Sequence, residues 1–232
     1  MKKVYKHLFF DLDRTLWDFD KNSEQTLFEI YEQWFLAENC SCSFDDFLKI
    51  YREINHQLWE DYRQEKISKE FLNLERFRKT LELIKCEHYE NAQLIADYYV
   101  EQSPMKTLLF PDAEYVLQQL KSRYHLHIIT NGFEEIQFRK LKNSNLEHYF
   151  STVITSEMAG CKKPDPGIFT FSLNLANAKL FESIMIGDDP EVDILGAENF
   201  GMDSVFVNFE NIKTDIKSKF EVKSLSELLT IL

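Results

Sequence analysis

Apolar side chains recur at helical spacing through residues 22–102, a stretch without any Gly or Pro. A spacing of three to four residues is the period of an amphipathic helix. The stretch holds four such runs, and a polar residue that can cap a helix N-terminus opens each of the first three. The runs begin at Asn22 or Ser23, at Ser43, at Ser68 and near residue 89. Pro104 closes the stretch, because proline disfavours helix at the residue before it. The pattern predicts a unit of four helices.

From residue 108 onward, short apolar runs alternate with helical patterns. Short apolar runs bounded by turn residues are typical of buried strands in a parallel sheet. We expect strands at 7–10, 125–129, 152–155, 183–186 and 204–207. We expect helices at 111–121, 133–144, 166–176 and 190–199. The alternation predicts an α/β fold, with a Rossmann-like parallel sheet covered by helices on both faces. The polar stretch 210–223 is assigned no regular element.

The helical stretch has the position of an insertion. Thr130 follows Asp11 at a distance far beyond the roughly 30 residues of one βαβ unit. The excess matches the four predicted helices, which we therefore expect to interrupt the α/β domain after its first strand. The predicted domains are an α/β core of residues 1–18 and 106–232 and an all-helical cap domain of residues 19–105.

Polar residues follow the predicted strands at their carboxyl ends, the edge at which an open parallel sheet binds ligands. Asp11 and Asp13 come directly after the apolar run 7–10. Two carboxylates that lie close together raise each other's proton affinity unless a cation or hydrogen bonds offset their charge. Three further strands are followed by Thr130 and Asn131, by the connection 156–164, and by Asp188 and Asp189. This convergence predicts a metal site, an acid–base pair, or both.

The charge balance narrows the range of partners. The 232 residues include 27 Lys and Arg against 39 Asp and Glu, a net charge of -12. An acidic chain disfavours nonspecific contact with nucleic acid or with an anionic membrane surface. A small phosphorylated metabolite remains compatible with it, because a bound cation reverses the local field. No apolar run reaches the roughly 20 residues that cross a bilayer. We expect a cytoplasmic protein, either a monomer or a weak homodimer.

The cysteines form neither a CxxC pair nor a Cys/His array with the spacing of a zinc site. The four are Cys40, Cys42, Cys86 and Cys161. We therefore expect free thiols, with Cys40 and Cys42 beside a helix end, and no disulfide framework. Such cysteine usage is typical of a reducing cytoplasm.

Four motifs resemble those of the haloacid dehalogenase-like (HAD) superfamily of phosphohydrolases. The run Asp11-Leu12-Asp13-Arg14-Thr15-Leu16 is similar to its first motif, DxDxT. Thr130 before Asn131-Gly132 resembles the second, and Lys163 before Pro164 resembles the third. Gly187-Asp188-Asp189 with Asp193 resembles the fourth. Each motif alone is more often an ordinary turn. All four, however, occur in the family's order at the ends of predicted strands, so the resemblance covers nearly the whole chain.

The resemblance implies a Mg²⁺-dependent reaction that passes through an aspartyl-phosphate. Asp11 would attack phosphorus, while Asp13 would protonate the leaving alkoxide and then activate water. The metal would be held by Asp11, by Asp188 and by the main-chain carbonyl of Asp13. Lys163 would supply positive charge to the phosphoryl group, with the adjacent Lys162 as the alternative.

Further residues would support this chemistry. Thr130 and Asn131 would donate hydrogen bonds to the phosphate oxygens. Asp193 would orient the lysine of the third motif or a metal-bound water, and Asp189 stands where the family often has Ser or another small polar residue. Arg14 occupies a position that is often Gly in the family. Its bulk predicts an ordinary backbone angle there, and its charge would lie near the site.

The leading functional prediction is a phosphatase for a small phosphomonoester. The superfamily's true dehalogenases lack an acid at the position of Asp13, since they have no alkoxide to protonate. A helical cap inserted between the first two motifs would enclose the cleft, which would favour small metabolites. The run 11–19 with Asn22-Ser23 resembles the pyrimidine 5′-nucleotidase branch and implies a pyrimidine nucleoside 5′-monophosphate as substrate. The alternatives are a sugar-phosphate phosphatase, a phosphomutase of the same superfamily, and a receiver-like phosphoaspartate switch.

Overall fold

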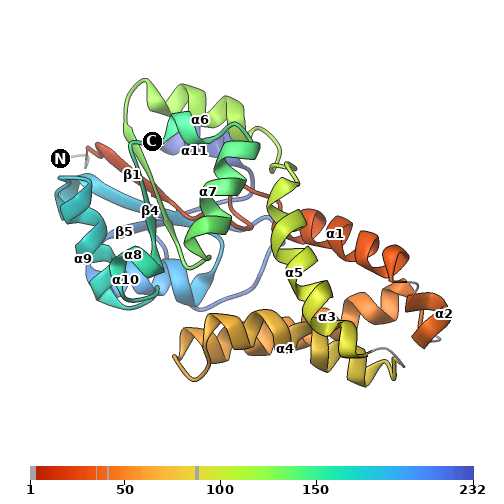
Figure 1. Ribbon diagram of the computed structural model, residues 1–232. Helices are drawn as coiled ribbons and strands as arrows, with labels where there is room; N and C mark the ends of the chain where they lie inside the picture. Colours follow the sequence, from red (N-terminus) through yellow and green to blue (C-terminus); the bar gives the residue numbers. More distant parts are fainter. Residues whose placement is uncertain (1–3, 35, 41, 87–88) are drawn as a thin grey trace. The chain divides into compact units, whose positions relative to one another are not determined.

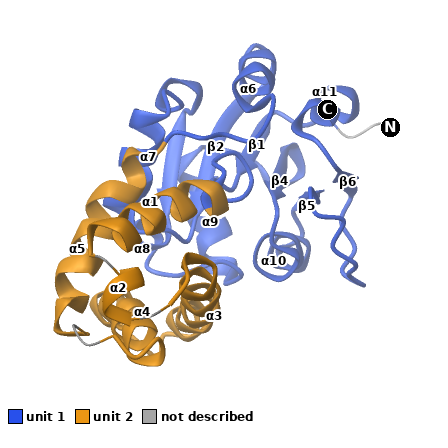
Figure 2. Ribbon diagram, turned by 90° about the vertical axis from the view of Figure 1, so that its right-hand side faces the viewer, with its two compact units in different colours: residues 1–19, 107–232 blue, residues 20–106 orange. Residues whose placement is uncertain are grey.

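The computed structural model describes residues 4–34, 36–40, 42–86 and 89–232. The chain forms two compact units, which Figure 2 shows in different colours. One unit contains Met1–Phe19 and Thr107–Leu232, and the other contains Asp20–Lys106. Each unit buries apolar side chains of its own.

Six parallel strands form the sheet of the first unit, in the order β3-β2-β1-β4-β5-β6 (Figure 1). The strands are β1 His7–Phe10, β2 His125–Thr130, β3 Thr152–Thr155, β4 Ser183–Gly187, β5 Asp203–Val207 and β6 Phe220–Val222. Five of them lie where the sequence predicts a strand, to within one residue at either end. The sixth, β6, lies inside the polar stretch 210–223 and has three residues, too few for a periodic pattern. Its pairing with β5 is what defines it.

Helices cover both faces of this sheet. They are α6 Ala113–Lys121, α7 Glu134–Asn143, α8 Ser156–Ala159, α9 Pro166–Leu175, α10 Gly196–Phe200 and α11 Leu228–Ile231. Side chains of a strand alternate between faces. Leu8 and Phe10 of β1 therefore pack with α6 and α11, whereas Phe9 packs with α9 and α10. Figure 1 shows these two pairs of helices on opposite sides of the sheet. The predicted α/β fold is confirmed.

Helices also make up the second unit. They are α1 Phe19–Gln33, α2 Leu36–Cys40, α3 Phe44–Arg63, α4 Lys69–Leu83 and α5 Ala92–Gln102. Ser43 and Ser68 cap α3 and α4 as expected, since each hydroxyl accepts a backbone N–H at 3.2 Å. The expected cap of α1 is wrong: Asn22 and Ser23 are buried inside the helix, and Ser23 Oγ lies 2.8 Å from the Tyr99 hydroxyl. The short helix α2 was not expected. No helix within the described ranges is long and apolar enough to cross a membrane.

The cysteines differ from the expectation of free thiols. Cys40, at the end of α2, forms a disulfide with Cys86, which follows α4. Their Cα atoms lie 4.3 Å apart, although they are 46 positions apart in sequence. Cys42 and Cys161 take no part in a disulfide and are partly buried. Spacing along the chain does not predict this bond, because it depends on how the helices of the unit pack.

Candidate active site

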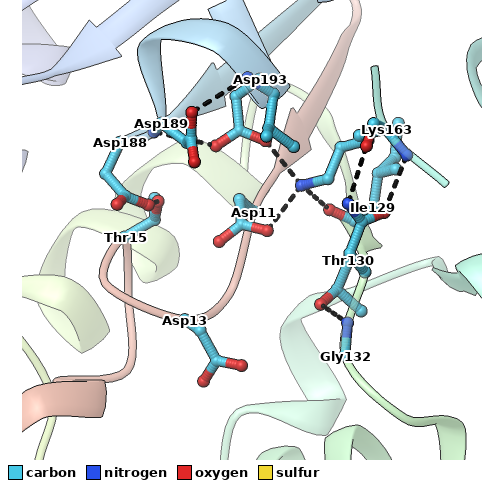
Figure 3. A network of polar contacts seen from close by, with 12 residues as sticks. Asp11, Asp13, Thr15, Ile129, Thr130, Gly132, Lys163, Asp188, Asp189 and Asp193 are labelled. Atoms are coloured by element: carbon cyan, nitrogen blue, oxygen red, sulfur yellow. Dashed lines mark hydrogen bonds and ion pairs between the residues drawn. The ribbon is translucent and has the colours of Figure 1, made fainter. Parts of the chain in front are cut away.

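The carboxyl ends of β1, β2 and β4 carry the candidate site (Figure 3). Asp11 directly follows β1, and its N–H donates to the Ile186 carbonyl of β4 at 2.9 Å. Thr130 ends β2, and Asp188 follows β4. The strand order runs outward from β1 to β2 and β3 on one side and through β4 to β6 on the other. Such a reversal is where an open α/β sheet binds ligands.

Lys163 is the centre of the polar network. Its ammonium donates to Asp11 Oδ1 and to Asp193 Oδ1, each at 2.6 Å, and to the Ile129 carbonyl at 2.8 Å. Its side chain is 2% exposed. An ammonium has three donors, and these three contacts use them all. The geometry thus distinguishes the two adjacent lysines, because Lys163 and not Lys162 contacts Asp11.

Asn131 holds the loop that carries this lysine. Its Nδ2 donates to the Lys163 carbonyl at 2.9 Å, and its Oδ1 accepts from the Lys163 N–H at 2.8 Å. Thr130 Oγ1 accepts from the Gly132 N–H at 3.0 Å and donates to Gln137 Oε1 at 3.2 Å. The Asn131 side chain therefore positions Lys163, a use that the sequence pattern does not indicate.

Burial and crowding of like charges shift the acidic groups toward protonation. Burial raises the pKa of Asp11 to about 7, although the Lys163 ammonium opposes the shift. Burial also raises the pKa of Asp188, and the carboxylates of Asp11 and Asp193 add to the effect. Burial alone would lower the pKa of Lys163, but these same two carboxylates raise it overall. Three carboxylates around one ammonium leave excess negative charge, which favours a bound cation.

The carboxylates themselves suit a hard divalent cation. One oxygen from each of Asp11, Asp188 and Asp193 lies within 4.8 Å of the other two. Both oxygens of Asp193 already accept hydrogen bonds, one from Lys163 and one from the Asp189 N–H, whereas Lys163 holds one oxygen of Asp11. Asp11 and Asp188 are therefore the better candidates for ligands. Thr15 Oγ1 donates to Asp188 Oδ1 at 2.8 Å and so orients that carboxylate. Carboxylate oxygens are the ligands that Mg²⁺ prefers, so the residues present fit this ion.

Asp189 and Asp193 shape the turn after β4. Asp189 Oδ1 accepts from two backbone N–H groups, each at 3.0 Å, and caps the π-helical segment Pro190–Leu195. This segment carries Asp193, whose Oδ2 accepts from the Asp189 N–H at 3.2 Å. A Cβ at Gly187 would lie 2.3 Å from the Asp193 carboxylate, so this close approach requires glycine. The helix predicted at 190–199 is therefore a π-helical segment followed by α10.

Asp13 is held apart from Asp11. Its Oδ1 accepts from Lys140 Nζ at 2.6 Å, and its Oδ2 accepts from Gln137 Nε2 at 3.0 Å. Figure 3 shows its carboxylate pointing away from Asp11. The Asp13 side chain is 24% exposed, against 11% for Asp11. Two carboxylates that are neighbours in sequence thus have separate partners, which permits separate chemical roles.

Arg14 corrects the expectation of an ordinary backbone angle. Its φ is 63°, in the left-handed region that glycine adopts most readily. Three backbone hydrogen bonds of 2.9 Å within the turn Leu12–Trp17 offset this strain. The guanidinium carbon lies 4.6 Å from the centre of the Phe19 ring. As expected from its charge, Arg14 acts on the site: burial raises the pKa of Asp188, and the guanidinium opposes that rise.

Three residues of this network escape prediction from the sequence: Thr15, Gln137 and Lys140. Thr15 belongs to the first motif, but only its contact with Asp188 reveals its use. Gln137 and Lys140 are three residues apart on α7, which places them on one face of that helix. Because α7 begins shortly after Thr130, polar residues on one face of this helix could have indicated that they lie near the candidate site.

Comparison with known proteins identifies the family. Residues 8–207 match the family described as haloacid dehalogenase-like hydrolase. The pyrimidine 5′-nucleotidase PynA of Streptococcus pneumoniae is 31% identical, over 98% of this chain and 95% of that protein. The pyrimidine 5′-nucleotidase YjjG of Escherichia coli is 32% identical, over 97% of this chain and 96% of that protein.

A solved structure shares the fold. It is the magnesium-bound crystal structure of the HAD-hydrolase YfnB from Bacillus subtilis, which matches with a TM-score of 0.90. The two sequences are 26% identical, and the match covers 99% of each chain. The family match includes strands β2 to β5, nearly all of β1 and all four motifs, and the two nucleotidases align over nearly the full length. The chain therefore belongs to the haloacid dehalogenase-like hydrolase family.

Proposed function

We propose that this hydrolase is a Mg²⁺-dependent phosphatase that cleaves a pyrimidine nucleoside 5′-monophosphate through an aspartyl-phosphate. The observation that carries the proposal is the separation of two carboxylates. Asp11 is held by Lys163 beside Asp188, whereas Asp13 is held by Lys140 and Gln137. Such a pair supplies a nucleophile and an independent proton donor. The two relatives named pyrimidine 5′-nucleotidases support the choice of substrate.

Asp11 and Asp188 are the residues that would hold Mg²⁺, with the main-chain carbonyl of Asp13 as the further ligand implied by the family. When bound, the ion supplies positive charge between an anionic carboxylate and a doubly anionic phosphomonoester. The excess negative charge around Lys163 supports the assignment, as does the hydrogen bond from Thr15 to Asp188.

The reaction proceeds in two half-reactions. In the first, Asp11 attacks phosphorus, the bond to the leaving oxygen breaks, and Asp13 gives its proton to that oxygen. In the second, the Asp13 carboxylate takes a proton from water, whose oxygen attacks phosphorus and displaces Asp11. Lys163 orients Asp11 and supplies positive charge to the phosphoryl oxygens. The Asn131 N–H is the proposed hydrogen-bond donor to these oxygens. The Thr130 hydroxyl, expected from the sequence as a second donor, already gives its proton to Gln137 Oε1.

A panel of phosphomonoesters tests the proposed substrate class. Phosphate release in the presence of Mg²⁺ is measured with pyrimidine and purine nucleoside 5′-monophosphates and with sugar phosphates. We expect the pyrimidine nucleotides to give the highest kcat/KM. Sugar phosphates that outpace every nucleotide would contradict the substrate assignment. An isomerised sugar phosphate without free phosphate would identify a mutase, and a phosphoaspartate that persists for many minutes would identify a switch.

Metal affinity separates the roles of Asp188 and Asp13. We expect Asp188→Asn to weaken Mg²⁺ binding at least about tenfold, equivalent to 1.4 kcal/mol, because a charged ligand is lost. Asp13→Asn keeps the main-chain carbonyl and should change the affinity by less than about threefold, equivalent to roughly 0.65 kcal/mol. Isothermal titration with Mg²⁺ alone measures both variants without turnover. Equal losses in the two variants would contradict the assignment of the ligands.

A further inference from the structure

Lys140 is a buried cation in the first unit. Its side chain, on α7, is 3% exposed, and its Nζ donates to Asp13 Oδ1 at 2.6 Å. The same Nζ lies 4.1 Å from the centre of the Trp17 ring and 5.4 Å from that of Phe19. Aromatic faces attract an ammonium, so these rings hold it in place and exclude water from it. A lysine that is this well enclosed is costly to keep charged unless it is paired, and its ion pair is with Asp13.

Gln137 holds the other oxygen of the same carboxylate. It is 1% exposed, and its Nε2 donates to Asp13 Oδ2 at 3.0 Å. Its own Oε1 accepts from Thr130 Oγ1 at 3.2 Å, which fixes the orientation of the amide. Each oxygen of Asp13 therefore has one donor from the same face of α7. Two donors from a rigid helix restrict the rotation of a carboxylate far more than one donor or water.

We propose that Lys140 and Gln137 are positioning residues that hold Asp13 for proton transfer to the leaving oxygen. The inference rests on the proposed function, because it needs Asp13 to serve as the acid. Lys140 and Gln137 touch neither the phosphoryl group nor the leaving group in this role; they act only through Asp13. Since an accurately placed acid contributes roughly 10²–10⁴-fold to the rate, the loss of its placement has a measurable cost.

The loss of rate caused by a misplaced Asp13 should depend on the leaving group. When the bond from phosphorus to the oxygen of an alkyl ester breaks, the electron pair stays on a strongly basic alkoxide, which needs the proton of Asp13. When the ester is p-nitrophenyl phosphate, the departing phenolate is stable without a proton. A displaced Asp13 should therefore slow the first half-reaction of alkyl esters and leave that of the aryl ester nearly unchanged.

Lys140→Met tests this expectation, because methionine fills the space against Trp17 and Phe19 without a charge. We expect kcat/KM to fall roughly 100-fold with the best nucleotide and less than about threefold with p-nitrophenyl phosphate. The matched control is Lys142→Met, on the same helix but exposed, which should leave both values unchanged. Gln137→Leu should show the same leaving-group dependence with a smaller loss of kcat/KM. It replaces Lys140→Met as the test variant if Lys140→Met does not fold. Equal losses with both esters would mean a structural role and overturn the proposal.

A double-mutant cycle tests whether the effect passes through Asp13. Once Asp13→Asn has removed the acid, the further change Lys140→Met should lower kcat/KM with the nucleotide less than about twofold. A further 100-fold loss in that background would show that Lys140 acts elsewhere and overturn the inference. The two proposals fail in different ways. A wild-type chain without activity on any phosphomonoester contradicts the proposed function, whereas an active wild type with independent, additive mutations contradicts only the positioning role.

Discussion

Replacing Asp11 with asparagine is expected to abolish phosphate release, with a loss of roughly four orders of magnitude or more. The amide has no negative charge and does not form the aspartyl-phosphate. The fold should be retained, because the amide oxygen can still accept the hydrogen bond that Lys163 gives to the carboxylate at 2.6 Å. Activity near that of the wild type would contradict the role of Asp11 as nucleophile.

The same variant should be at least as stable as the wild type when no metal is bound. Burial raises the pKa of Asp11 from 3.8 to about 7, so the folded state binds this proton more tightly than the unfolded state. The contribution to stability is therefore full below pH 4 and is lost as the pH rises through 7. The asparagine amide does not titrate, so the variant does not lose stability as the pH rises. At pH 8 in a chelator we expect an equal or higher Tm for Asp11→Asn, where one kcal/mol corresponds to about 2–4 °C for a chain of this size.

Thermal unfolding with and without Mg²⁺ provides the control. The ion should raise the Tm of the wild type more than that of Asp11→Asn, because a ligand that binds only the folded state stabilises it. Asp215→Asn, at an exposed position of the first unit, should behave as the wild type in both conditions. A lower Tm for Asp11→Asn in the chelator would contradict the account of a buried, unfavourable charge.

Replacing Lys163 with methionine is expected to abolish activity and to destabilise the fold by about 3–5 kcal/mol. The side chain is 2% exposed and donates to Asp11, to Asp193 and to a main-chain carbonyl. Its removal leaves two buried carboxylates without their shared cation. Methionine has a similar length, so the loss reflects the missing charge and hydrogen bonds more than an empty space.

The stability lost in Lys163→Met should depend on pH. Burial already raises the pKa of Asp11 and of Asp193 while Lys163 opposes it, and without the ammonium both values rise further. Groups with a raised pKa stabilise the folded state at low pH and lose that contribution as the pH increases. Denaturation with urea in a chelator should therefore show a larger difference from wild type at pH 8 than at pH 5.

Lys162→Met is the matched control, because the sequence alone leaves these two adjacent lysines as alternatives. Lys162 is partly exposed, and we expect its replacement to change stability by no more than about 0.5 kcal/mol. A Lys163→Met variant that loses the same stability at both pH values would contradict the electrostatic explanation.

The α/β fold and the clustering of the main residues of the candidate site could be predicted because they depend on local patterns. Leu8, Phe9 and Phe10 of β1 are all apolar because the two faces of the strand enter two cores. Parallel strands align their carboxyl ends, so residues such as Asp11, Thr130 and Asp188 meet at one edge without any knowledge of their side-chain contacts. Capping serines likewise act within one turn of helix, which is why the predicted caps at Ser43 and Ser68 are confirmed.

What the pattern did not reveal depends on contacts between distant segments. Ser23 resembles a cap, but the packing of α1 gives it a partner at Tyr99. Arg14 adopts a left-handed angle because the turn around it supplies compensating hydrogen bonds. Cys40 and Cys86 form a disulfide because helix packing brings their backbones together. None of these features has a period along the chain.

The amino-acid sequence alone determined that two carboxylates follow the first strand of a parallel sheet, with a threonine, a lysine and a further aspartate at its neighbours. Tertiary structure decided which partners each of these two carboxylates has. Lys163 reaches Asp11 from a loop held by Asn131, and one face of α7 reaches both oxygens of Asp13. The reason is physical: periodicity places a backbone, whereas the direction of a charged side chain is set by partners that are far away in sequence.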